Sequence, residues 1–239
     1  MTPAPPLFVF EDVVKPIGGP IPLRIARFEF RAGDRVVLSG LDAMAAEMFM
    51  HVLTGAALPE TGRVDVFGQS TRDIETDTAW LAALDRFGLV SNRAVLLDQS
   101  TIAQNLALPL TLSIDPMADD VRHAVERMAA DVRLGAARLD ALAGTMTPEE
   151  RMRAHLARAI ALNPEVLLLE HPTATLGTRG AAFGETLRAL SAARSLSWLA
   201  ISDDEAFARA AGGRALRLNP STGRVGPAGR FWRRWFSVA

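Results

Sequence analysis

The chain has 239 residues, of which 49% are hydrophobic, and its formal net charge at pH 7 is −1. This composition suffices for a substantial core and excludes an intrinsically disordered chain, while a net charge near zero gives no global attraction to nucleic acid. The sequence has no cysteine, which excludes disulfides and cysteine–zinc sites, and its four histidines are scattered along the chain, so no metal site is expected.

The N-terminus does not combine a basic region with an apolar core, so it does not have the pattern of a secretory signal. The most apolar run, Ala154–Leu169, is interrupted by Arg158, Asn163 and Pro164. It falls short of the roughly 18 to 20 apolar residues that a membrane span needs. We therefore expect a cytoplasmic chain whose membrane association, if any, is peripheral at the inner face of the cell membrane.

Short alternating segments predict strands in the first half of the chain. Leu7–Phe10 and Arg24–Phe30 are expected to form an antiparallel hairpin around a Pro/Gly-rich turn. A third strand, Arg35–Leu38, ends at Ser39-Gly40 and leads into a helix over Ala43–Leu53. Further strands are predicted over 62–67 and 87–90, so this half of the chain is mixed α/β.

The second half begins with a helical region and returns to an α/β alternation. Apolar residues recur with a helical period over Asp119–Val132, and Thr147-Pro148-Glu149-Glu150 is a capping box for a helix that runs to about Leu162. Strands over 166–169 and 198–201 flank a helix over 182–193, which indicates a parallel sheet. We divide the chain into an α/β core (1–98 and 164–225), an inserted helical subdomain (99–163) and a basic-aromatic tail (226–239).

Several spacings in the chain resemble one family. The chain has Ser39-Gly40 before a helix that ends at Thr54-Gly55, then the helix over 151–162, and then the run Leu167-Leu168-Leu169-Glu170-His171-Pro172-Thr173. The order and spacing of these three features resemble those of the ATP-binding subunits of ABC transporters. The resemblance covers residues 7–225. It implies a P-loop NTPase-like ABC ATPase fold, with ATP and magnesium as ligands.

The residues at the phosphate-binding loop depart from the family pattern. A P-loop holds phosphate with glycine N–H groups, a lysine and a Ser/Thr hydroxyl. Gly40 and Asp42 are followed by Ala46 where the resemblance places the lysine and by Glu47 where it places the hydroxyl. The only lysine of the chain, Lys15, lies upstream in the predicted hairpin.

The other motif positions also differ from the family. Asn92 stands at the Q-loop glutamine, Glu170 at the Walker B aspartate, His171 at the glutamate that polarises water, and Asp203 at the switch histidine. In the signature motif, Thr147 keeps a hydroxyl, but Pro148 has no N–H to donate, and Glu149 and Glu150 follow. We interpret Glu47, Glu149 and Asp203 as carboxylates that would repel a γ-phosphate.

These departures predict weak or absent binding of ATP and magnesium, and a non-hydrolysing partner or regulatory subunit of a transport complex. Its expected partners are a membrane permease subunit, a competent ABC ATPase subunit as dimer partner, or both, and no nucleic acid. One alternative is an atypical ATPase with His171 as the base and an arginine such as Arg93 neutralising charge. Another is a free-standing regulatory module. The tail, Arg230–Phe236, could lie on a membrane, dock a partner helix or pack back onto the domain.

Overall fold

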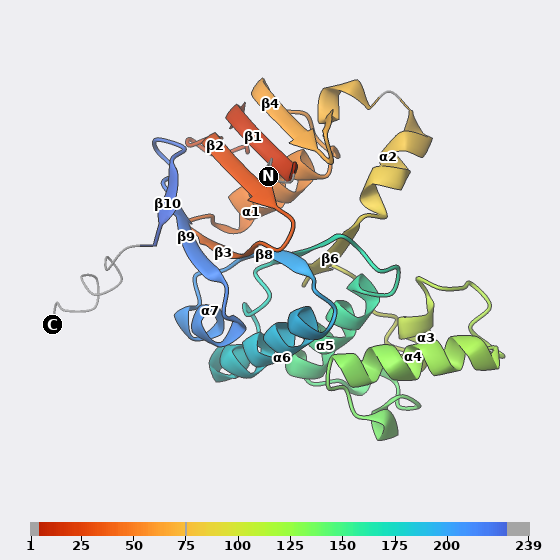
Figure 1. Ribbon diagram of the computed structural model, residues 1–239. Helices are drawn as coiled ribbons and strands as arrows, with labels where there is room; N and C mark the ends of the chain where they lie inside the picture. Colours follow the sequence, from red (N-terminus) through yellow and green to blue (C-terminus); the bar gives the residue numbers. More distant parts are fainter. Residues whose placement is uncertain (1–4, 75, 229–239) are drawn as a thin grey trace, which may run out of the picture.

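A computed structural model describes residues 5–74 and 76–228 of the protein, which contain two β-sheets. The first sheet has the order β2-β1-β4-β5 and is antiparallel (Figure 1). Its strands are β1 (Pro6–Lys15), β2 (Leu23–Arg31), β4 (Thr61–Val66) and β5 (Gln69–Ser70). The second sheet has the order β10-β9-β3-β8-β7-β6. Its strands are β3 (Arg35–Ser39), β6 (Phe87–Ser91), β7 (Val166–Glu170), β8 (Ser197–Ile201), β9 (Arg214–Leu218) and β10 (Val225–Pro227).

The described residues form seven α-helices and four short 3-10 helices. The α-helices are α1 (Ala43–Leu53), α2 (Asp77–Leu84), α3 (Ile102–Ala107), α4 (Asp119–Asp131), α5 (Pro148–Ala159), α6 (Gly180–Ala193) and α7 (Glu205–Ala211). The 3-10 helices are η1 (Thr71–Asp73), η2 (Ala136–Arg138), η3 (Ala143–Thr145) and η4 (Gly177–Arg179). Helices α3, α4 and α5 pack against one another (Figure 1).

The six-stranded sheet lies between two apolar layers, because successive side chains of a strand point to opposite faces. On β3, Val36 and Leu38 join a cluster with α1 and the antiparallel sheet, while Val37 joins a cluster with α3 to α7. In the first cluster, Phe8 stacks on Phe30 with ring centroids 4.7 Å apart. This sheet therefore has buried residues on both faces, as parallel sheets require.

The predicted hairpin, the parallel sheet and the α/β fold class are confirmed. Strands β1 and β2 pair antiparallel, and the pairs β3/β8, β3/β9, β6/β7 and β7/β8 are all parallel. Strand β1 extends to Lys15, five residues beyond the predicted end, because it pairs with two neighbours. The helix expected to reach about Leu162 ends at Ala159.

Sequence reasoning did not predict the helices α2, α3 and α7 or the strands β5, β9 and β10. No residue of α2 is buried, so its sequence has no marked apolar face. Only Phe207 and Ala211 of α7 are buried, and β9 buries alternate residues between exposed arginines. The subdomain boundaries remain a prediction, and most of the predicted tail lies outside the described residues.

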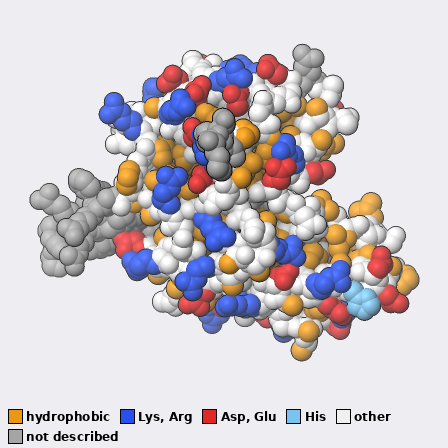
Figure 2. Space-filling model, in the orientation of Figure 1, with side chains coloured by type: hydrophobic (Ala, Val, Ile, Leu, Met, Phe, Trp, Pro, Cys, Tyr) orange, Lys and Arg blue, Asp and Glu red, His pale blue; other side chains and the backbone are white. Residues whose placement is uncertain are grey.

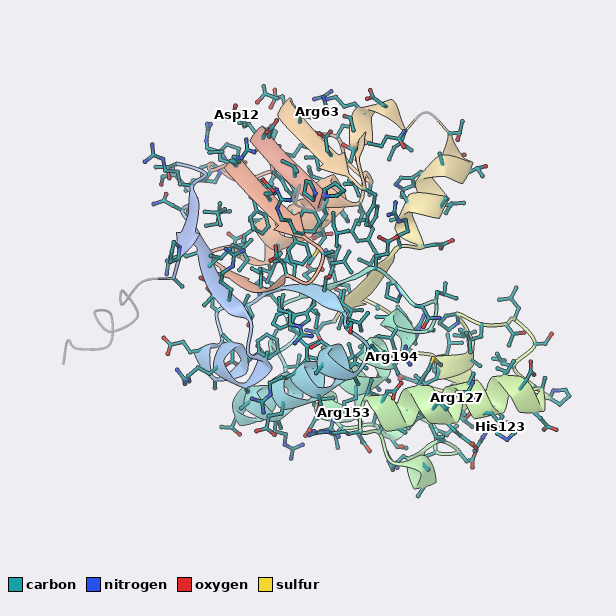
Figure 3. The ribbon with its side chains drawn as sticks, viewed as in Figure 1. Asp12, Arg63, His123, Arg127, Arg153 and Arg194 are labelled. Atoms are coloured by element: carbon teal, nitrogen blue, oxygen red, sulfur yellow. The ribbon has the colours of Figure 1, made fainter. Side chains whose placement is uncertain are left out.

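Charged side chains cover the outer face of the antiparallel sheet in alternating sign, as Figure 2 shows over its upper part. Arg27 pairs with Glu11 at 2.9 Å, and Arg63 pairs with Asp65 at 2.5 Å. Exposed pairs of this kind contribute little to stability. Elsewhere, Arg194, which follows α6 and is labelled in Figure 3, forms an ion pair with Asp131 at the end of α4. In the part of the chain that the structure describes, no helix is long and apolar enough to cross a membrane.

Candidate functional site

The turn between β3 and α1 is short and is closed by the protein's own side chains. Gly40 has φ +89°, and a Cβ there would lie 2.3 Å from the Leu218 carbonyl oxygen, so the neighbouring strand β9 requires glycine. Leu41 is buried in the core. The Asp42 carboxylate caps α1 by accepting a hydrogen bond from the Ala45 N–H at 2.8 Å.

The segment 202–204 after β8, which is the predicted switch region, contacts the same turn. The Gly40 N–H donates to the Asp203 carboxylate at 3.1 Å. Thr173 and Ser202 lie beside it with their hydroxyls 3.3 Å apart, and Asp204 caps α7 by accepting from the Phe207 N–H at 2.9 Å. Two of the predicted site residues, Gly40 and Asp203, are thus in direct contact. The backbone N–H groups of Gly40, Ala45 and Phe207 therefore already have carboxylate partners.

Arg93 bridges two other predicted site residues across a cleft of about 400 Å³. One guanidinium nitrogen contacts the Glu47 carboxylate on α1, and another lies 2.6 Å from the Glu170 carboxylate at the end of β7. The Glu170 side chain is 10% exposed, whereas the Arg93 and Glu47 side chains are each 45% exposed. Glu47 therefore has a cationic partner, which corrects the expectation that it is an uncompensated carboxylate.

His171 and Asn92 are also brought together, but the His171 imidazole takes no part in their contact. The Asn92 side-chain amide donates to the His171 backbone carbonyl at 3.1 Å. His171 has φ +41°, an uncommon conformation for a residue other than glycine. Among the described residues, its buried Nε2 atom has no hydrogen-bond partner. Ala46 is fully buried and holds the first turn of α1 against the core.

The signature-like residues form a separate, self-contained cap at the start of α5. The Thr147 hydroxyl accepts from the Glu150 N–H at 3.2 Å, and the Glu150 carboxylate accepts from the Thr147 N–H at 2.8 Å. The Arg138 guanidinium pairs with Glu150 at 2.8 Å and holds the pKa of that carboxyl below its usual value. Glu149 pairs with Arg153 at 2.7 Å. The expected repulsive carboxylates at this position are therefore compensated as well.

Sequence reasoning identified Glu47, Glu170 and Asp203 but missed how they are held. The position of Arg93 directly after Asn92, the residue predicted for the Q-loop, was a signal for its bridge, because a guanidinium can pair with two carboxylates at once. His155 of α5 was not singled out, although it is buried beside Arg158 and Arg151. Burial, with these two cations, lowers its pKa to about 4. The described residues contain no group of three or more His, Asp or Glu that could hold a metal ion.

Comparisons with known proteins place this geometry in context. The profile of the family described as "ABC transporter" matches residues 23–174. The chain is 32% identical over 190 residues to the "Lipoprotein-releasing system ATP-binding protein LolD" of Gluconobacter oxydans, covering 77% of this chain and 80% of that protein. It is 30% identical over 177 residues to the "Methionine import ATP-binding protein MetN" of Caulobacter vibrioides, covering 71% of this chain and 51% of that protein. A bacterial ABC transporter cassette solved as a dimer superposes with a TM-score of 0.76 at 20% identity, covering 92% of this chain and 98% of that one.

Proposed function

The chain belongs to the ABC transporter family, and we propose that it is a non-hydrolysing subunit that works by binding protein partners. The observation that carries this proposal is the pair of carboxylates on the turn after β3. Asp42 holds the Ala45 N–H and Asp203 holds the Gly40 N–H. A helix N-terminus binds phosphate through free N–H groups and its positive dipole end. Here two of the N–H groups around this turn already have carboxylate partners, and the Asp42 carboxylate lies at the positive end of the α1 dipole.

The neighbouring side chains do not fit a triphosphate with magnesium. Ala46 has no charge to offer a phosphate, and the Glu47 carboxylate, which is paired with Arg93, offers no hydroxyl to a magnesium ion and no donor to a phosphate. Arg93 cannot replace the lysine without leaving Glu47 and Glu170, to both of which it is bonded. Its guanidinium instead acts as a built-in cation between two carboxylates. These contacts support an architecture that is complete without a nucleotide.

The start of α5 supports the same conclusion for a nucleotide held by a partner subunit. Thr147 and Glu150 satisfy each other's N–H groups, and Pro148 has none. Few donors therefore remain for a γ-phosphate presented by a second ATPase subunit. In a heterodimer with a competent ATPase subunit, this chain would contribute protein–protein contacts at the interface and no catalytic groups.

Calorimetric titration with ATP and magnesium tests the proposal directly. The 32% identical relative from Gluconobacter oxydans, whose name describes it as ATP-binding, is the positive control. We expect no binding to this chain up to millimolar ATP, while the control binds. A dissociation constant in the micromolar range, which corresponds to about −8 kcal/mol, would refute the proposal.

The partner surface that we propose is the groove between β6 and α5. It encloses about 320 Å³ and is mostly apolar, with Leu81, Leu89 and Leu162 lining it. These three residues are 54%, 48% and 53% exposed, respectively. We propose that a segment of a membrane permease subunit fills this groove. One relative, from Pseudomonas entomophila, is 27% identical to this chain over 157 residues. Its name, "Probable export ATP-binding/permease protein MacB", describes an ATP-binding part and a permease part in one protein.

Co-purification with a permease encoded beside this chain tests the groove. Leu81→Asp should abolish co-purification, because it buries a charge in an apolar contact. Leu112→Asp is the matched control, since Leu112 is 91% exposed and does not line the groove. Equal loss in both variants, or no loss in either, would contradict the assignment. A chain with no neighbouring permease gene would favour the free-standing regulatory module.

A specific observation favours the second candidate, an atypical ATPase. Strained backbone and unpaired buried polar atoms concentrate at functional sites, and His171 has both. Phosphate release that requires magnesium and disappears in His171→Ala would support this function. We expect no release above background from either the wild-type chain or the variant.

A further inference from the structure

A shallow groove runs beside the last described strand, on the face of the six-stranded sheet that carries α7. It encloses about 180 Å³ and is mostly apolar. Its lining residues come from β3, the switch region, α7, β9 and the end of the described chain: Val37, Ser39, Ser202, Asp203, Asp204, Glu205, Ala208, Arg209, Ala215, Leu216 and Ala228. Alanines at 208, 215 and 228 leave room along its walls.

The rim of the groove carries carboxylates that lack a cationic partner. Asp203 and Asp204 accept hydrogen bonds from the backbone N–H groups of Gly40 and Phe207, respectively. Among the described residues, neither carboxylate has an arginine or lysine within ion-pair distance. Glu205 pairs with Arg209 at 3.1 Å. The groove therefore combines an apolar floor with an uncompensated negative rim, and a basic, aromatic segment would complement both.

The chain itself provides such a segment at the edge of the groove. The Ala228 N–H donates to the Ala215 carbonyl at 3.1 Å, so the chain follows β9 along the groove up to the last described residue. The sequence continues Gly-Arg-Phe-Trp-Arg-Arg-Trp-Phe-Ser-Val-Ala over residues 229–239. Ala228 itself lines the groove, and an extended residue spans about 3.3–3.6 Å, so the segment that follows starts at the groove and has the length to run along it.

We propose that Arg230–Phe236 docks into this groove of its own chain, with aromatic rings on the apolar floor and arginines beside Asp203 and Asp204. Aromatic side chains bury large areas, and arginine pairs well with carboxylates. The attachment at Ala228 makes docking intramolecular, so its effective concentration is high. The docked tail would lie against the Gly40–Asp203 contact. This proposal is independent of nucleotide binding.

Limited proteolysis of the full chain with trypsin tests the docking, because trypsin cleaves after arginine. Cleavage after Arg230, Arg233 and Arg234 is followed by mass spectrometry and compared with a synthetic peptide of residues 226–239. Protease susceptibility tracks the undocked population when opening is fast. We expect cleavage to be at least about tenfold slower in the chain than in the peptide, which corresponds to about 1.4 kcal/mol of docking.

Two variants separate docking from general resistance. Ala215→Arg places a bulky cation in the groove and should restore peptide-like cleavage, whereas Ala130→Arg on the exposed part of α4 should leave protection unchanged. Circular dichroism confirms that each variant is folded. In the tail, Arg233→Glu with Arg234→Glu should accelerate cleavage after Arg230, relative to a peptide with the same changes. This second variant leaves every described residue intact.

The same assay distinguishes the competing occupants. Peptide-like cleavage of the wild-type chain would overturn the proposal. Protection that appears only with vesicles of phosphatidylcholine and phosphatidylserine would assign the tail to an anionic membrane and would overturn it as well. Protection that is lost on dilution would assign the groove to the tail of a second copy and refute intramolecular docking. Protection without vesicles and at every concentration, removed by Ala215→Arg, is the outcome that supports it.

Discussion

Truncating Arg93 is expected to destabilise the protein through the two carboxylates that it leaves behind. An exposed ion pair such as that with Glu47 contributes about 0–1 kcal/mol. Glu170 is different because its side chain is only 10% exposed, and breaking a buried pair costs about 3–5 kcal/mol. Because the Arg93 side chain is 45% exposed, water can enter after truncation and reduce this cost. We expect a loss of about 2 kcal/mol in the free energy of unfolding of Arg93→Ala, between these two limits.

Urea denaturation and thermal unfolding measure this loss, which should lower the melting temperature by roughly 4–8 °C in a chain of this size. Arg127→Ala is the matched control, because this exposed arginine lies on α4 (Figure 3). Adding Glu170→Gln to Arg93→Ala should recover part of the stability, since an amide is less costly to bury than an unpaired charge. If Arg93→Ala were no more destabilising than Arg127→Ala, the bridge would have no energetic role and the reasoning would be wrong.

Three further changes probe the turn, the cap and the buried histidine. Gly40→Ala should lower the free energy of unfolding by more than the roughly 1 kcal/mol that the positive φ alone would cost, because the new Cβ would clash with the Leu218 carbonyl oxygen. Gly33→Ala is its control in urea denaturation, since Gly33 has φ +85° and open space around it. Thr147→Ala should lower stability by about 1 kcal/mol and leave the calorimetric ATP titration unchanged, whereas altered nucleotide binding would show that the cap has a ligand. As pH falls from 6.5 to about 4, His155 protonates first in the unfolded chain, so wild type should lose up to about 3 kcal/mol more stability than His155→Gln. Parallel pH profiles of the two proteins in urea denaturation would contradict the buried, neutral state of this histidine.

The elements that could be predicted from sequence are those whose own residues carry a periodic or capping signal. Thr147-Pro148-Glu149-Glu150 predicted the start of α5 at the correct residue, because a capping box is a local interaction. The helix α2 has a capping residue, Thr76, but no periodic apolar signal, since none of its residues is buried. The strand β10 has neither signal in its three residues and is held by pairing with β9.

For the candidate site, the sequence by itself determined the chemical types: alanine, glutamate, histidine and aspartate at the positions that the resemblance predicts for the nucleotide site. Only the tertiary structure decided their partners. Glu47 and Glu170 are 123 residues apart, and Arg93 neutralises them because α1, the segment after β6 and the end of β7 meet at one cleft. The effect of a carboxylate depends on the charges within a few ångströms of it, and those distances are set by the fold. For Glu47 and Glu149, the structure therefore changed the interpretation from uncompensated carboxylates to carboxylates paired with arginine, whereas Asp203 has the Gly40 backbone N–H as its partner.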